Sequence, residues 1–111
     1  IDNNKNSIKT YKKNKKTEII APYTMTKIKE MMMQVSKVGT AKTLVDLDGG
    51  CGVKTGTAQS SLNGKKISHG WITGFYPEIN PKYAITVIIE GTEKESKSAI
   101  PIFKEICENL K

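Results

Sequence analysis

Apolar residues recur at helical spacing in the first half of the chain. Between residues 25 and 37 they occupy every third or fourth position, in one stripe made of Met25, Ile28, Met31, Met32 and Val35. This period predicts an amphipathic helix over residues 25–37, with the apolar stripe packed in a core. Thr24 suits the N-cap position of this helix, and Gly39 suits the C′ position just after it.

Two short segments flank the predicted helix. Residues 18–21 are mostly apolar and end at Pro22, a pattern typical of the end of a strand. Residues 40–48 form a connector or short helix that ends in the turn Asp48-Gly49-Gly50. Asp46 and Asp48 give a partial match to a calcium loop, but the third acidic ligand and the distal glutamate are missing. Turn chemistry is therefore the better interpretation.

After Cys51 the pattern changes to one typical of strands. Residues 53–59 and 67–76 predict two strands, and Asn63-Gly64 between them predicts a tight hairpin turn. Residues 83–89 are rich in β-branched side chains and predict a third strand. Because both alternating sets of this third strand are apolar, we expect both of its faces to be covered.

A second helix is predicted at the C-terminus. Ser96 or Ser98 is the expected cap, and Pro101 is tolerated in the first turn. One face of this helix carries Ala99, Ile102, Phe103, Ile106 and Leu110. The predicted fold is α+β, with an antiparallel sheet of three or more strands and flanking N- and C-terminal helices.

The positive charge of the chain is concentrated at its N-terminus. The 111 residues carry a formal net charge of +7, and every basic residue is a lysine. Residues 1–17 are interpreted as a polar, lysine-rich arm, and residues 18–111 as one folded segment. The charge, with Trp71, Phe75 and Tyr76 as a stacking platform, leaves open a non-catalytic basic module that binds nucleic acid. The absence of arginine weakens that alternative.

Other features narrow the class of protein. Cys51 and Cys107 fit neither a zinc motif nor a disulfide framework, so we interpret them as small, half-buried hydrophobic residues. We expect no metal and no cofactor. No apolar run approaches the roughly 20 residues that span a bilayer. The chain begins with Ile1, without methionine or a signal peptide, which indicates an excised segment whose targeting signals lie upstream.

The strand at residues 53–59 carries the candidate chemistry, in Lys54-Thr55-Gly56-Thr57. Alternation places Lys54 and Gly56 on one face of the strand and Thr55 and Thr57 on the other. A glycine leaves space for a ligand beside the strand, and an ammonium with nearby hydroxyls suits a carboxylate. A backbone N–H at the edge of the strand can point at a developing oxyanion.

Lys-Thr-Gly is one of the three signature motifs of penicillin-binding proteins and serine β-lactamases. The surrounding segments are Val38-Gly39-Thr40-Ala41, Lys54-Thr55-Gly56-Thr57-Ala58-Gln59, His69-Gly70-Trp71-Ile72-Thr73-Gly74-Phe75-Tyr76-Pro77 and Asn80-Pro81-Lys82-Tyr83-Ala84. Over residues 18–111 this succession resembles the C-terminal part of the transpeptidase domain of high-molecular-mass penicillin-binding proteins, a portion of the β-lactamase/transpeptidase-like fold. Val53 stands where that family often has glycine.

The resemblance implies a role for each residue of the motif. Lys54 would form a hydrogen bond with the serine of the family's second signature motif, Ser-x-Asn, and attract the carboxylate of the substrate. The hydroxyls of Thr55 and Thr57 would hold the terminal carboxylate of a D-Ala-D-Ala stem peptide or of a β-lactam. Gly56 would let the acyl group lie close, and the N–H of Thr57 would form half of an oxyanion hole. The parent protein would cross-link peptidoglycan at the extracytoplasmic face of the bacterial membrane, anchored upstream.

The chain lacks the nucleophile that this reaction requires. No Ser-x-x-Lys occurs in it, and Ser61-Leu62-Asn63 matches the Ser-x-Asn motif only by chance, since it follows Lys-Thr-Gly in a hairpin turn. His69 is more simply a packed neighbour of Trp71 than a general base. We therefore expect the chain alone to form no acyl-enzyme and to be inactive. A non-catalytic structural relative is the other alternative, and exposed apolar faces favour self-association or strand exchange.

Overall fold

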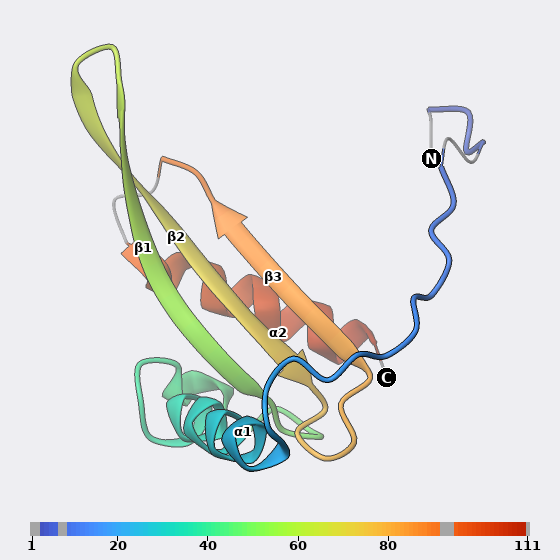
Figure 1. Cartoon of the computed structure of the whole chain (residues 1–111). Helices are drawn as coiled ribbons and strands as arrows, with labels where there is room; N and C mark the ends of the chain where they lie inside the picture. The colour runs from blue at the N-terminus through green and yellow to red at the C-terminus, as the bar shows by residue number, and fades with distance from the viewer. Residues whose placement is uncertain (1–2, 7–8, 92–94, 111) are drawn as a thin grey trace.

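A computed structural model describes residues 3–6, 9–91 and 95–110 of the chain. Its elements are α1 (Pro22–Lys37), the 3₁₀ turn η1 (Lys42–Leu44), β1 (Gly52–Leu62), β2 (Lys65–Tyr76), β3 (Tyr83–Ile89), the 3₁₀ turn η2 (Glu95–Ala99) and α2 (Ile100–Asn109). Figure 1 shows α2 lying along one face of the sheet and α1 beside the start of β1. The predicted α+β fold, with an antiparallel sheet and two flanking helices, is confirmed.

The three strands are antiparallel neighbours in the order β1-β2-β3. Asn63 and Gly64 join β1 to β2 with positive φ angles of 52° and 76°, as the hairpin prediction requires. β3 pairs only with the second half of β2, from Gly70 opposite Ile89 to Tyr76 opposite Tyr83. The far half of the β1–β2 hairpin therefore extends beyond the sheet as a two-stranded ribbon (Figure 1).

The main core lies between the sheet and α2. Val53, Ile72 and Val87, one from each strand, are buried in the same cluster as Phe103 and Cys107 of α2. The expectation that both faces of β3 are covered is wrong, because Ile88 on its other face is 63% exposed. Among the described residues, α2 covers only the face that carries Val87, so the second apolar set of β3 remains open to solvent.

The first helix begins earlier than its apolar stripe indicates. Its N-cap is Ala21, and Pro22 occupies the first turn, so the assignment of Thr24 as N-cap is wrong. Proline tolerates this position because its φ angle suits a helix and the missing N–H has no intrahelical partner there. The preceding residues 18–21 form no strand, and Ile19 among them is 90% exposed.

The apolar stripe of α1 is only partly buried. Ile28, Met32 and Val35 are half-buried, whereas Met25 and Met31 are 40% and 62% exposed. The helix packs most closely near its C-terminal end, because Ser36 is its buried residue. The Ser36 hydroxyl lies 2.7 Å from the Cys51 carbonyl oxygen and donates to it, which joins α1 to the residue preceding β1.

The predicted C-terminal helix is present as α2, but its N-cap and the exposure of Ile102 differ from the prediction. Pro101 lies in its first turn, and Phe103 is fully buried. Its N-cap is Ala99, preceded by η2, so neither Ser96 nor Ser98 caps it. Ile102 is 41% exposed, which places it at the margin of the predicted apolar face.

The N-terminal arm contains no helix or strand in its described residues, 3–6 and 9–17, which are all exposed. Within residues 3–6, 9–91 and 95–110, neither helix has the length and apolar character needed to cross a lipid bilayer.

Candidate functional site

The four residues of the candidate motif lie on β1, an outer strand of the sheet. The side chain of Thr55 is only 6% exposed, because it points into the core beside Val53. Lys54 points to the other face and is exposed. Thr57 is exposed as well, because the core ends before it reaches this part of β1. The side chains of Lys54 and Thr57 are therefore exposed to solvent, whereas that of Thr55 is almost entirely buried.

The Lys54 side chain folds back along its own strand. Its Nζ donates a hydrogen bond to the carbonyl oxygen of Thr55. In an antiparallel strand the backbone groups of residues i and i+2 point to the same side. The N–H of Thr57 therefore has the same direction as the carbonyl of Thr55, and the ammonium of Lys54 lies beside this row of backbone groups.

Gly56 lies directly under the indole of Trp71. The two residues are cross-strand partners, and a Cβ atom on Gly56 would come within 2.4 Å of Trp71 Cε2. Gly52 and Phe75 form a similar pair, with 2.2 Å between a Cβ on Gly52 and Phe75 Cζ. On this face of the sheet, aromatic rings of β2 occupy the space that the glycines of β1 leave open.

A shallow pocket of about 410 Å³ lies on the same face, next to the motif. The pocket is lined by Ala58 of β1, His69 and Trp71 of β2, Ile88 of β3, and Glu90, which directly follows β3. Ala58, Ile88 and Glu90 were not singled out in the sequence. A two-residue turn at Asn63-Gly64 sets Ala58 opposite His69, so hairpin register is the signal that would have placed Ala58 here.

The histidine has the contacts of a structural residue. Its Nε2 lies 2.7 Å from Ser60 Oγ, and its Nδ1 accepts a hydrogen bond of 3.3 Å from the Gly91 N–H. Because Nδ1 accepts, the neutral ring carries its proton on Nε2 and donates it to Ser60. In this arrangement His69 does not accept a proton from Ser60, so it does not activate the Ser60 hydroxyl as a nucleophile.

The two cysteines are also unsuited to nucleophilic chemistry. Both thiols are buried, more deeply than the half-buried state expected from the sequence. Burial raises the pKa of Cys51 to about 11 and that of Cys107 to about 12. The thiolate is the reactive form, so both side chains are inert near neutral pH.

The aromatic residues do not form one stacking platform. Trp71 and Phe75 are half-buried on one face, but Tyr76 is buried on the other and donates to the Asp48 carbonyl at 3.0 Å. Ser61-Leu62-Asn63 lies at the distal end of the β1–β2 hairpin, where Asn63 is a turn residue. In the part of the chain that the structure describes, no three His, Cys, Asp or Glu residues gather as metal ligands would.

Comparison with known proteins identifies a family. The sequence matches the penicillin binding protein transpeptidase domain over residues 1–108, a span that includes the N-terminal arm. A relative from Neisseria flavescens, the probable peptidoglycan D,D-transpeptidase PenA, is 32% identical over 96 residues. The alignment covers 79% of this chain and 24% of the relative, so the chain spans about a quarter of the length of this protein.

Proposed function

The chain belongs to the penicillin-binding protein transpeptidase domain family, and from this premise we propose that it forms the C-terminal part of a peptidoglycan D,D-transpeptidase. In this role β1 supplies the strand that binds the C-terminal carboxylate of a D-Ala-D-Ala stem peptide, or the carboxylate of a β-lactam. The observation that carries the proposal is the position of Lys54 and Thr57, which are both exposed on an outer strand.

The geometry supports different roles for Lys54, Thr55 and Thr57 in the motif. The Lys54 ammonium supplies positive charge at the edge of β1, where a carboxylate would replace the Thr55 carbonyl as its partner. The Thr57 hydroxyl is accessible to the same carboxylate, whereas the Thr55 hydroxyl is nearly buried. The Thr57 N–H points along the same edge and is the donor that we assign to the oxyanion hole.

The acyl-transfer step itself belongs to the longer protein. Transfer needs a serine that attacks the peptide carbonyl, and this chain contains no Ser-x-x-Lys. We assign that serine to an upstream part of the parent protein, anchored to the membrane and acting at its extracytoplasmic face. The isolated chain then recognises the carboxylate and forms no covalent adduct.

The proposal is tested by titrating the ¹⁵N-labelled chain with an acyl-D-Ala-D-Ala peptide and following the amide resonances. The resonances of Thr55 and Thr57 should shift with the free acid and remain unchanged with the C-terminal amide, which lacks the carboxylate. Lys54→Ala should abolish the shift, whereas Lys66→Ala on the projecting hairpin should preserve it. Equal shifts with acid and amide would refute carboxylate recognition by this strand.

A further inference from the structure

The four residues that lead into β1, residues 48–51, are bound through each of their carbonyl groups by donors from outside this segment, which we call the anchor segment. The backbone N–H of Glu78, in the connection from β2 to β3, lies 3.0 Å from the Gly49 carbonyl oxygen and 3.1 Å from that of Gly50, and donates to both. The Glu78 side chain also covers Gly50, because a Cβ atom there would lie 2.6 Å from Glu78 Cδ. Both glycines have positive φ angles, of 89° and 61°, which other residues rarely adopt.

Two side-chain hydroxyls hold the ends of the anchor segment. The Tyr76 hydroxyl donates to the Asp48 carbonyl oxygen at 3.0 Å. The Ser36 hydroxyl lies 2.7 Å from the Cys51 carbonyl oxygen and 2.8 Å from that of Met33, and its single proton serves both. Ser36 and Tyr76 are buried, so the packing around them fixes the points from which they donate.

The donors come from two parts of the fold that are tied to each other. Ser36 lies in the last turn of α1, whereas Tyr76 ends β2 and Glu78 follows soon after it. Lys37, the last residue of α1, forms an ion pair with Glu78, with 3.1 Å from Nζ to Oε2. The Lys82 N–H donates to the Tyr76 carbonyl oxygen at 3.0 Å and closes the connection from β2 to β3. The anchor segment is therefore held both by α1 and by this connection, which Figure 1 shows next to the start of β1.

Backbone direction relates the anchor segment to the proposed carboxylate site. Thr73 and Thr86 face each other across β2 and β3, with their hydroxyl oxygens 2.8 Å apart. Such close side chains are typical of a non-hydrogen-bonded pair, so the backbone groups of Thr73 point to β1 and bond those of Lys54. Alternation then directs the backbone groups of Thr55 and Thr57 to the outer edge of β1, where we place the carboxylate.

This site requires an accurately placed strand. A carboxylate bound by Lys54 and Thr57 together needs both residues within roughly 0.5 Å of their productive positions. β2 binds β1 along its inner edge, starting at Gly52, and the ligand would bind at the other edge. The anchor segment ends one residue before Gly52, so it fixes the end of β1 that lies closest to Lys54.

We propose that Tyr76 and Ser36 are positioning residues for the carboxylate site. By holding the two ends of the anchor segment they fix the start of β1, and with it the positions of Lys54 and Thr57. The inference rests on the proposed function of β1. Both hydroxyls act through the backbone of the anchor segment, so their loss weakens carboxylate binding without removing a group that touches the ligand.

Titration of the full chain with an acyl-D-Ala-D-Ala peptide, as free acid and as amide, tests the effect on binding. Tyr76→Phe and Ser36→Ala each remove one hydroxyl oxygen and no other heavy atom. Followed at the Thr57 amide, at a temperature where every variant is folded, each should raise the dissociation constant of the free acid about three- to tenfold, the effect of one hydrogen bond on an equilibrium. Tyr83→Phe and Ser61→Ala remove exposed hydroxyls away from the anchor segment and should leave it unchanged.

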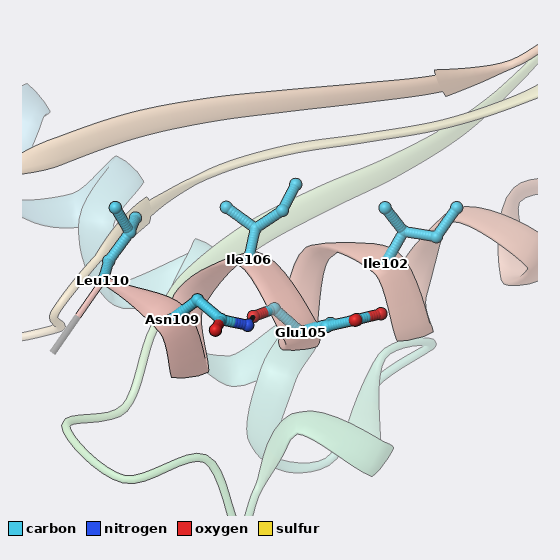
Figure 2. Close-up of a pocket in the computed structure, with 5 residues that line it drawn as sticks. All are labelled: Ile102, Glu105, Ile106, Asn109 and Leu110. Carbon is cyan, nitrogen blue, oxygen red and sulfur yellow. Dashed lines mark hydrogen bonds between the residues drawn. The ribbon is translucent and has the colours of Figure 1, made fainter.

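Native-state hydrogen exchange separates positioning from general stability. The amides of Lys54 and Gly56 face β2, and that of Ile106 is the reference, because Ile106 of α2 packs against the core and is directed toward the sheet (Figure 2). In Tyr76→Phe and Ser36→Ala the protection of Lys54 and Gly56 should fall by a larger factor than that of Ile106. A loss of global stability alone would lower all three by the same factor.

The two measurements together decide the role of these hydroxyls. Weaker binding of the free acid with selective loss of protection in β1 is the expected result. Variants that bind the acid as tightly as the wild type, or that lose protection uniformly, would overturn the positioning role while carboxylate recognition by the wild type stands. A wild type that does not distinguish the free acid from the amide would refute the proposed function itself, and this inference with it.

Discussion

The indole of Trp71 covers Gly56 so closely that a Cβ atom on the glycine would lie 2.4 Å from Trp71 Cε2. Glycine as the last residue of the Lys-Thr-Gly motif therefore has a structural cause within this chain. The ring of β2 occupies one face of β1 at this position, and a larger residue at 56 would displace it. Any ligand role of Gly56 is additional to this packing requirement.

Gly56→Ala should destabilise the fold. The added methyl group forces the Trp71 ring away from β1, and overpacking of this kind costs about 1–3 kcal/mol of unfolding free energy. Urea denaturation measures the loss. In a Trp71→Ala background the same substitution should cost much less, because the clashing ring is gone. Equal costs in the two backgrounds would show that the ring is not responsible.

Ser36→Ala should also lower stability, through a different mechanism. The variant leaves the Cys51 carbonyl without the buried hydroxyl that lies 2.7 Å from it. An unsatisfied buried acceptor costs about 1–3 kcal/mol. Ser61→Ala, on the exposed hairpin, is the matched control and should change the unfolding free energy by less than about 0.5 kcal/mol. A Ser36→Ala variant as stable as this control would contradict the assigned role.

The pair Asp46–Lys104 should make stability depend on pH at both extremes. The hydrogen bond from Lys104 and its charge lower the pKa of Asp46 below 3.8, and the bond to Asp46 raises the pKa of Lys104 above 10.5. The stabilisation is present at neutral pH, is lost as Asp46 becomes protonated below pH 3.8, and is lost again above pH 10.5. Asp46→Asn and the wild type should therefore converge at acid pH, whereas Glu105→Gln should retain the acid-dependent loss. Parallel curves for Asp46→Asn and the wild type would refute the coupling.

The cysteines should react with a thiol reagent only after unfolding. Burial raises the pKa of Cys51 to about 11 and of Cys107 to about 12, so at pH 8 the folded protein holds almost no thiolate. Ellman's reagent should detect no thiol in the native chain and two in guanidinium chloride. The thiols of the less stable Gly56→Ala variant should react with Ellman's reagent faster than those of the native wild type. Rapid reaction of native wild-type protein would contradict the burial.

Lys54 should control acylation in a protein that carries this sequence behind a Ser-x-x-Lys motif. Lys54→Ala removes the charge to which we assign attraction of the β-lactam carboxylate, so the second-order rate of acylation by fluorescent penicillin should fall steeply. Lys66→Ala should leave the rate unchanged. The 111-residue chain alone should show no labelled band after denaturing electrophoresis. A labelled band from the chain alone would show that the chain does contain a nucleophile that penicillin acylates.

Local features of the sequence determined the elements and the family. The apolar period predicted α1 and α2 within a few residues, and alternation with Asn63-Gly64 predicted the hairpin and its antiparallel partner β3. These predictions succeeded because helix period and turn chemistry depend on residues close together in the chain. The Lys-Thr-Gly strand and its neighbours likewise identified the family without a structure.

Tertiary packing decided what the pattern left open. Both faces of β3 are apolar in sequence, yet only one meets α2, so Val87 is buried and Ile88 is exposed. Thr55 and Thr57 share a face, yet only Thr55 lies over the core. Alternation states which side chains share a face, but burial depends on which distant element packs there. The position of α2 therefore decided which residues of this chain remain open to a ligand or a partner.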